Sequence, residues 1–286
     1  MPEPIVHFDS VTYTYPGTDS PALSGISLDI MPGEYVGVIG LNGAGKTTLG
    51  LSLNGVVPTM LSGRREGRVI VGGLAVEEYP VREMAKIVGM VFDNPEFQMS
   101  QMTCAEEVAL GLESAGVDFE TMRRSVTEAL NLVGLQGFEE RSPLALSGGQ
   151  QQRLAIAAVL AMKPQVLVMD EPTSNLDPIG KREVFAMAAT LNQDYGMTVI
   201  VIEHEVEVLA EHADRIIVMD GGRIVLNGGS AEIFSRVEEL QELGLRVPEA
   251  TSLAHLLGQK GHWKAKTPIN SAEAVRAVNE MLKVGA

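Results

Sequence analysis

One short glycine-rich segment limits the folds that this chain can adopt. Residues Gly40–Thr47 read GLNGAGKT, which matches the pattern G-x-x-x-x-G-K-[ST] of a phosphate-binding loop. The apolar run Tyr35–Ile39 before it predicts a buried strand, and residues 46–54 after it predict a helix. The alternative is a glycine-rich turn that matches the pattern by chance. It would not explain why the segment lies between a strand and a helix, the place where backbone N–H groups converge on a phosphate.

The residue types of this loop suit a bound nucleotide. The glycines let the backbone curl around the phosphates, so that successive N–H groups and the helix dipole point at them. Lys46 supplies a positive charge for the β- and γ-phosphates and is a catalytic candidate, and the Thr47 hydroxyl suits Mg²⁺. The predicted nucleotide-binding residues of the loop are Asn42, Gly43, Ala44, Gly45, Lys46, Thr47 and Thr48.

Two carboxylates end a second apolar strand, predicted over residues 165–170. In P-loop enzymes an aspartate placed like Asp170 holds Mg²⁺, and Glu171 is then expected to orient and deprotonate the attacking water. Capping of the next helix is the alternative role for these acidic residues. His204 follows the next apolar strand and is expected to contact the γ-phosphate, although a histidine at such a place is often structural.

The pentapeptide Leu146–Gln150 reads LSGGQ and opens the last helix of a helical stretch. Together with the glycine loop, Asp170-Glu171, Asp177 and His204, it resembles the ATP-binding cassette (ABC) ATPases over residues 5–228. The resemblance implies a P-loop fold and ATP hydrolysis with Mg²⁺, in a head-to-tail dimer that holds two ATP molecules between its subunits.

The resemblance also implies roles for residues outside the glycine loop. Tyr15 corresponds to the aromatic residue that stacks on adenine, with Tyr13 as the competing choice. Asp177 corresponds to the residue that couples the two sites of the dimer. The signature residues expected to contact ATP held by the other subunit are Ser147, Gly148, Gly149 and Gln150.

One position departs from the family pattern. After the strand at residues 87–92 the family usually carries a glutamine that touches Mg²⁺, whereas this chain carries Asp93. A carboxylate is a suitable Mg²⁺ ligand, so Asp93 is retained as a metal candidate. It is shorter than glutamine and places a negative charge near the γ-phosphate, so slower or differently gated turnover is expected.

Two further segments indicate a subgroup of the family. Residues 94–98 (NPEFQ) and 105–109 (AEEVA) resemble the ATPase subunits of energy-coupling factor importers, which serve vitamins, cobalt and nickel. The partners so implied are a second ATPase subunit, either the same chain or a related paralogue, a transmembrane coupling subunit and a substrate-capturing membrane protein. The coupling subunit would enter a groove near Asp93. The alternatives are the ATPase of another importer, a soluble ABC ATPase of DNA repair or translation, and a P-loop kinase.

Composition and charge narrow these alternatives. The chain has 286 residues and a formal net charge of −15, which opposes binding to nucleic acid phosphates or to anionic lipid. No stretch approaches the roughly 20 apolar residues of a membrane-spanning helix. We therefore expect no nucleic acid partner and no direct membrane insertion, and a peripheral location on the cytoplasmic face of the cell membrane. The single cysteine, Cys104, is expected to be a small, partly buried side chain.

The strand and helix signals predict an α/β fold. Strands alternating with helices indicate a mostly parallel central sheet, with an antiparallel β subdomain formed by residues 5–15 and 22–30. The predicted ATPase domain covers residues 1–228 and includes a helical subdomain at about 101–160. Residues 229–286 would form a small helical domain for dimerisation or regulation, or a packing tail, with Asn270 capping a final helix that has Glu273 three residues on.

Overall fold

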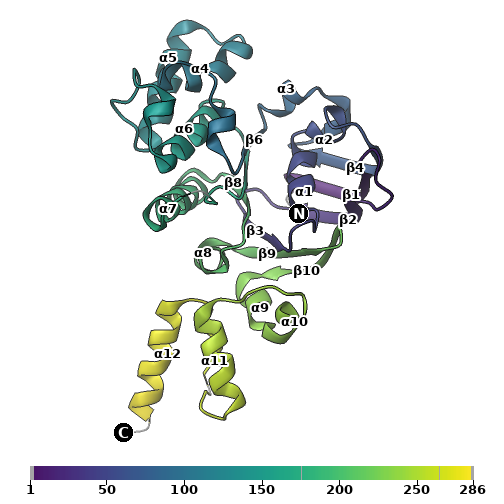
Figure 1. Ribbon diagram of the computed structural model, residues 1–286, viewed down its shortest axis with the longest axis vertical. Helices are drawn as coiled ribbons and strands as arrows, with labels where there is room; N and C mark the ends of the chain where they lie inside the picture. The colour runs from purple at the N-terminus through teal and green to yellow at the C-terminus, as the bar shows by residue number, and fades with distance from the viewer. Residues whose placement is uncertain (1–2, 175, 264, 285–286) are drawn as a thin grey trace.

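The computed structural model describes residues 3–174, 176–263 and 265–284 and contains two β-sheets (Figure 1). The larger sheet has six strands, and its five neighbouring strands from β9 to β6 are parallel, as predicted, while β10 at the edge runs antiparallel to β9. In spatial order its strands are β10 (Arg223–Gly229), β9 (Arg215–Asp220), β3 (Tyr35–Gly40), β8 (Thr198–Ile202), β7 (Val166–Asp170) and β6 (Val88–Val91).

The central strands of this sheet are buried on both faces. Every residue of β3, β7 and β8 is buried, which explains why their sequences are continuous apolar runs without alternation. Side chains still alternate between the faces: Val36 and Val38 belong to one hydrophobic cluster, and Tyr35 and Ile39 belong to the other. The core therefore has two layers, and the sheet lies between them.

The smaller sheet is antiparallel, which confirms the strands predicted from residues 5–15 and 22–30. Its order is β2 (Leu23–Ile30), β1 (Val6–Thr14), β4 (Arg64–Val71) and β5 (Leu74–Ala75). Helix α1 (Lys46–Leu53) follows the glycine loop and shares a hydrophobic cluster with this sheet. The short elements after it are α2 (Val56–Thr59), η1 (Val76–Glu78) and α3 (Val81–Met84).

Helices fill the segment between β6 and β7, where helical periodicity was predicted. They are η2 (Pro95–Gln98), α4 (Cys104–Ser114), α5 (Phe119–Leu132), η3 (Pro143–Ala145) and α6 (Gly148–Ala161). Each of the three α-helices begins at a side-chain cap, namely Thr103, Asp118 and Ser147, whose oxygen accepts a bond from an N–H in the first turn. Cys104 is fully buried, whereas partial burial was predicted.

The last part of the chain is helical, and its first half packs into the main core. It follows α7 (Pro178–Tyr195) and α8 (Val206–His212) and comprises α9 (Ser230–Ser235), α10 (Val237–Glu242), α11 (Glu249–Gln259) and α12 (Ser271–Val284). Ile233, Phe234 and Leu240 share a hydrophobic cluster with β3 and β8, whereas α11 and α12 extend away from the sheets (Figure 1). The Asn270 cap is confirmed, because its Oδ1 accepts from the Glu273 N–H at 2.9 Å. The division at residue 228 stays a prediction.

The packing of α9 leads to a stability prediction. Phe234 is 0% exposed, so Phe234→Ala should lower the free energy of unfolding by about 3–5 kcal/mol through lost transfer energy and a cavity. Leu256→Ala is the control on α11, where the side chain is 56% exposed, and should change stability by no more than about 0.5 kcal/mol. Urea unfolding of both variants provides the measurement, and equal small effects would show that α9 is not part of the core.

Candidate nucleotide-binding and hydrolysis site

The glycine loop joins β3 to α1 in a shape that only glycines permit at key positions. Gly43 and Gly45 have φ values of 80° and 101°, in the region that disfavours other residues. A Cβ on Gly40 would lie 2.4 Å from the Met219 carbonyl oxygen, and one on Gly45 would lie 2.4 Å from that of Ala22. The loop is therefore fixed against β9 and the start of β2. Asn42, Gly43 and Thr47 lie exposed on it, while Ala44 and Thr48 are buried.

Lys46 at the start of α1 is buried, with 5% of its surface exposed. Its Nζ donates to the carbonyl oxygens of Gly40 and Leu41 at 2.9 and 3.1 Å, so the ammonium group lies over the loop itself. Burial lowers the pKa of Lys46, and the charges of Glu171 and Asp170 oppose that shift. The predicted positive charge and both predicted carboxylates therefore belong to one electrostatic cluster.

Asp170 ends β7 and lies beside the loop, only 6% exposed. Burial raises the pKa of Asp170, a hydrogen bond with the Thr47 side chain opposes this, and the charges of Glu171 and Asp93 add to it. Its Oδ1 is buried without a hydrogen-bond partner among the described residues. A buried carboxylate oxygen with no donor, next to a threonine hydroxyl, fits a hard cation such as Mg²⁺.

Glu171 and His204 face each other across the ends of β7 and β8. Glu171 Oε1 lies 2.9 Å from His204 Nε2, and the Glu171 N–H donates to the Ile202 carbonyl at 2.9 Å. The two side chains are 33% and 43% exposed, so both remain accessible to a substrate. Glu171 adopts φ 49°, an uncommon conformation for a non-glycine residue that turns the chain sharply after the strand. Neither Asp170 nor Glu171 caps α7, because Asp177 does.

The signature residues and Asp177 meet at the starts of α6 and α7. Ser147 Oγ accepts from the Gln150 N–H, while Gln150 Oε1 accepts from the Ser147 N–H at 3.0 Å. Asp177 Oδ1 accepts from the Gly180 N–H at 2.7 Å. The two helix starts line a single pocket of about 220 Å³, and no glycine-loop residue lines it. Ser147, Gly148, Gly149, Gln150 and Asp177 thus lie together but apart from the glycine loop.

The two candidate aromatic residues differ in exposure. Tyr13 is 0% exposed, and its hydroxyl donates to the Leu61 carbonyl at 2.8 Å, so its ring has no face for a ligand. Tyr15 is half-buried, packs edge-on against Tyr13 at 4.8 Å and shares a 3.1 Å hydrogen bond with Thr48. This contact places Tyr15 next to α1 and favours it over Tyr13 as the adenine contact.

Asp93 follows β6 at the edge of the site. It is exposed, its backbone carbonyl accepts from Ser174 Oγ at 3.3 Å, and its charge reaches Asp170. Gln98, the nearest glutamine downstream, does not replace it. The Gln98 amide bonds back to the β6 end, where its Oε1 accepts from the Phe92 N–H at 3.1 Å.

Sequence reasoning missed one residue of this edge. Glu203 lies directly before His204 and is 4% exposed, with hydrogen bonds to Thr173 and to the His204 N–H. An acidic residue that continues the apolar run of β8 was the available signal, because a carboxylate is rarely buried without partners.

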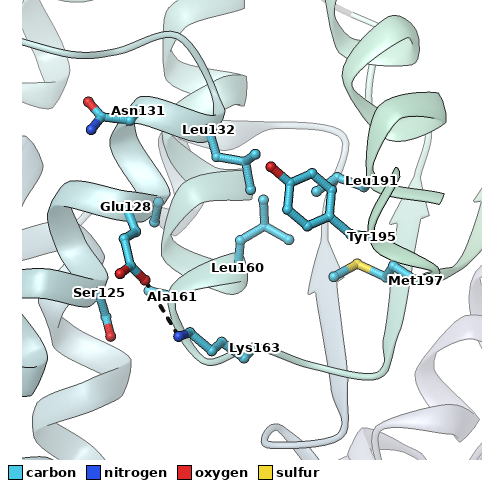
Figure 2. A pocket seen from close by; sticks show the side chains of 11 residues that line it. Ser125, Glu128, Asn131, Leu132, Leu160, Ala161, Lys163, Leu191, Tyr195 and Met197 are labelled. Carbon is cyan, nitrogen blue, oxygen red and sulfur yellow. Dashed lines mark hydrogen bonds and ion pairs between the residues drawn. The ribbon is translucent and has the colours of Figure 1, made fainter. Parts of the chain in front are cut away.

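A second cavity, of about 780 Å³, lies away from all of these residues. Figure 2 shows its apolar wall, formed by Leu132, Leu160, Leu191 and Tyr195, at the C-terminal ends of α5, α6 and α7. An ion pair of 3.5 Å between Lys163 and Glu128 lies at its rim. No residue predicted to act in the site lines this cavity.

Comparisons with known proteins identify the family of this chain. The family model described as ABC transporter matches residues 23–174. The energy-coupling factor transporter ATP-binding protein EcfA1 of Lacticaseibacillus paracasei is 41% identical over 257 residues, which are 90% of each chain.

Two solved structures are similar to this chain, each at 29% identity. One is cbiO1 from Clostridium perfringens, described as part of the ABC transporter complex cbiONQ; it has a TM-score of 0.75 over 90% of this chain and 99% of its own. The other is a dimeric ATP-binding cassette in a post-hydrolysis state with ADP and phosphate, with a TM-score of 0.68 over 79% of this chain and 98% of its own. The chain therefore belongs to the ABC transporter family of ATP-binding proteins, whose characteristic reaction is the hydrolysis of ATP.

Proposed function

We propose that this chain is the ATPase subunit of an importer of the energy-coupling factor type, which drives uptake of a vitamin or a transition metal ion. The observation that carries the hydrolytic part is the Glu171–His204 pair, 2.9 Å apart and beside Asp170 and the glycine loop. The importer part is supported by the 41% identity to an energy-coupling factor ATPase and by the similarity to cbiO1.

Each residue of the site would have a separate role in ATP hydrolysis. The glycine loop would hold the phosphates through its N–H groups, and Lys46 would leave the loop carbonyls to neutralise the β- and γ-phosphates. Glu171 would accept a proton from the attacking water, while His204 would hold the γ-phosphate and fix the Glu171 carboxylate. Tyr15 would stack on the adenine.

Mg²⁺ would be held by Thr47 and Asp170 together with phosphate oxygens. Phosphate oxygens of ATP and water would complete the octahedral coordination that Mg²⁺ prefers. When bound, Mg²⁺ neutralises charge that develops on the phosphates. Asp93 would act from the outer edge of this site, and its extra negative charge is expected to slow turnover.

A dimer would complete the site. The pocket of the signature residues and Asp177 is separate from the glycine loop of the same chain, so we assign these residues to ATP bound by a second subunit. ABC ATPases act as dimers, as in the similar cassette with ADP and phosphate. A complete set of Glu171 and signature residues allows a homodimer, and a related paralogue is the other possible partner. Leu253, Leu256 and Val275 are exposed on α11 and α12 and would add a contact between two subunits that ATP has brought together.

A surface next to Asp93 suits a membrane partner. In the part of the chain that the structure describes, no helix is long and apolar enough to cross a membrane. Phe97 lies on η2 and Met102 lies two residues before α4, and their exposed fractions are 88% and 82%. A groove of about 610 Å³ is lined by α4 and α5, and its apolar lining includes Met122 and Val126. Its charged lining residues are the four glutamates Glu106, Glu113, Glu139 and Glu140 and one arginine, Arg123.

We assign this surface to a cytoplasmic helix of the transmembrane coupling subunit. A groove with apolar lining and four glutamates against one arginine favours a helix with apolar anchors flanked by Lys or Arg. The chain would then work at the cytoplasmic face of the membrane through this contact. A small membrane protein that captures the substrate would complete the importer.

The role of Glu171 gives the first functional prediction. Glu171→Gln keeps the size of the side chain but removes the proton acceptor, so kcat for ATP hydrolysis should fall by about 100-fold or more. The Kd for ATP should stay within about threefold, because the phosphate contacts remain. Turnover assays and equilibrium binding of a fluorescent ATP analogue provide the measurements. Normal turnover in this variant would refute the assignment of Glu171 as the base.

The importer proposal is tested by affinity capture with this variant. Tagged Glu171→Gln, incubated with ATP and detergent-solubilised native membranes, should retain integral membrane proteins identifiable by mass spectrometry. The matched control adds Phe97→Asp and Met102→Asp, which should abolish this capture but leave ATP affinity unchanged. Capture of a small membrane protein would support the energy-coupling factor type, whereas a periplasmic or surface binding protein would indicate another importer. Recovery of soluble proteins alone would contradict a role in transport.

A further inference from the structure

We propose that Glu203 is a positioning residue for ATP hydrolysis, which sets the distance between Glu171 and His204 through a hydrogen bond to Thr173. Glu203 is 4% exposed and Thr173 is 1% exposed. Neither faces solvent, and neither is assigned to the phosphate, metal or signature contacts described above. The inference rests on the proposed roles of Glu171 and His204 and adds a residue that acts through them.

The two oxygens of Glu203 join separate parts of the site. Oε1 accepts from the Thr173 hydroxyl at 2.5 Å, and Oε2 accepts from the His204 N–H at 2.7 Å. The Glu203 N–H donates to the Val38 carbonyl at 3.2 Å. One residue therefore connects the strand before the glycine loop, the turn after β7 and the backbone of His204.

The Thr173–Glu203 bond and the Glu171–His204 contact join the same two loops. Thr173 lies two residues after Glu171, and Glu203 lies one residue before His204, so the Thr173–Glu203 bond spans the same two loops as the Glu171–His204 contact. The bond from the Glu171 N–H to the Ile202 carbonyl adds a backbone link between the loops. On the other side of His204, Glu205 pairs with Lys181 of α7. The backbone of His204 is thus held by its neighbours on both sides.

A carboxylate suits this position better than an amide does. Two donors point at Glu203, one from the Thr173 hydroxyl and one from a backbone N–H, and a carboxylate accepts at both oxygens. An amide offers one acceptor oxygen, so Glu203→Gln places an NH₂ group against one of these donors or forces the Thr173 hydroxyl to rotate. Burying a charged group costs free energy unless the group is hydrogen-bonded. An apolar residue would avoid this cost if the position served packing alone.

The test measures the substitutions in two backgrounds, one that keeps His204 and one that carries His204→Ala. All variants are made in the 286-residue chain and assayed with Mg²⁺ and ATP. The variants are Glu203→Gln, Thr173→Val and Thr173→Ser, and Glu203→Gln is also made in a His204→Ala background. The readouts are kcat and KM, with single-turnover hydrolysis of labelled ATP for slow variants, and the Kd of a fluorescent ATP analogue. His204→Ala alone measures the proposed role of His204, so a failure of that role is seen separately from a failure of the present inference.

Glu203→Gln and Thr173→Val should each lower kcat by about 10–100-fold, the usual effect of losing a partner that orients a reacting group. The Kd for ATP should stay within about twofold, and Thr173→Ser, which keeps the hydroxyl, should remain within about twofold of the wild-type kcat. In the His204→Ala background, Glu203→Gln should change kcat by less than about twofold, because the residue through which it acts is gone.

Three results would overturn the inference. The first is an equal fold-loss of kcat from Glu203→Gln with and without His204. The second is a loss of ATP affinity as large as the loss of kcat, and the third is a Thr173→Ser variant as impaired as Thr173→Val. If Glu203→Gln does not fold, Thr173→Val takes its place in both backgrounds, where the same comparison decides.

Discussion

The parallel ladder formed by β3, β8 and β7 positions the glycine loop, His204 and the Asp170-Glu171 pair relative to one another. Parallel pairing aligns the carboxyl ends of these strands, so the glycine loop, His204 and the Asp170-Glu171 pair leave the sheet at one edge. The registers are specific: Val38 pairs with Ile202, and Ile202 pairs with Asp170. Because all three strands are buried on both faces, a shift of one residue would move apolar side chains between the two core layers. Core packing thus keeps the predicted catalytic groups aligned at the ends of these strands.

Two buried charged side chains near the ends of these strands, Lys46 and Asp170, suit a substrate that carries both negative phosphates and a metal ion. Lys46 is buried and bonded to carbonyls, and Asp170 has a buried oxygen without a partner among the described residues. Burial lowers the pKa of the first and raises that of the second, so each is held in surroundings that disfavour its charge. Phosphates for Lys46 and Mg²⁺ for Asp170 would relieve both costs.

Much of this fold and site could be predicted from sequence because the signals are local. A glycine loop between a strand and a helix, an apolar strand ending in Asp170-Glu171, and caps such as Asn270 depend on neighbouring residues. Glu203 could not be predicted as a link, because its partner Thr173 lies 30 positions away and meets it only through strand pairing. The burial of Tyr13 was equally hidden, since β1 alternates and either tyrosine fits the pattern. The packing of α9 against the main core depends on tertiary contacts that no local pattern encodes.

The proposed dimer has a shared site, in which one chain supplies the glycine loop and hydrolytic residues while a second supplies the signature residues and Asp177. Sedimentation velocity of Glu171→Gln with and without Mg²⁺ and ATP tests it most directly, because this variant should bind ATP without consuming it. We predict monomers without nucleotide and dimers with ATP, and a further Ser147→Arg substitution should prevent dimer formation by obstructing the signature pocket. Glu171→Gln that stays monomeric with saturating ATP, or a Ser147→Arg variant that still forms dimers, would contradict the shared site.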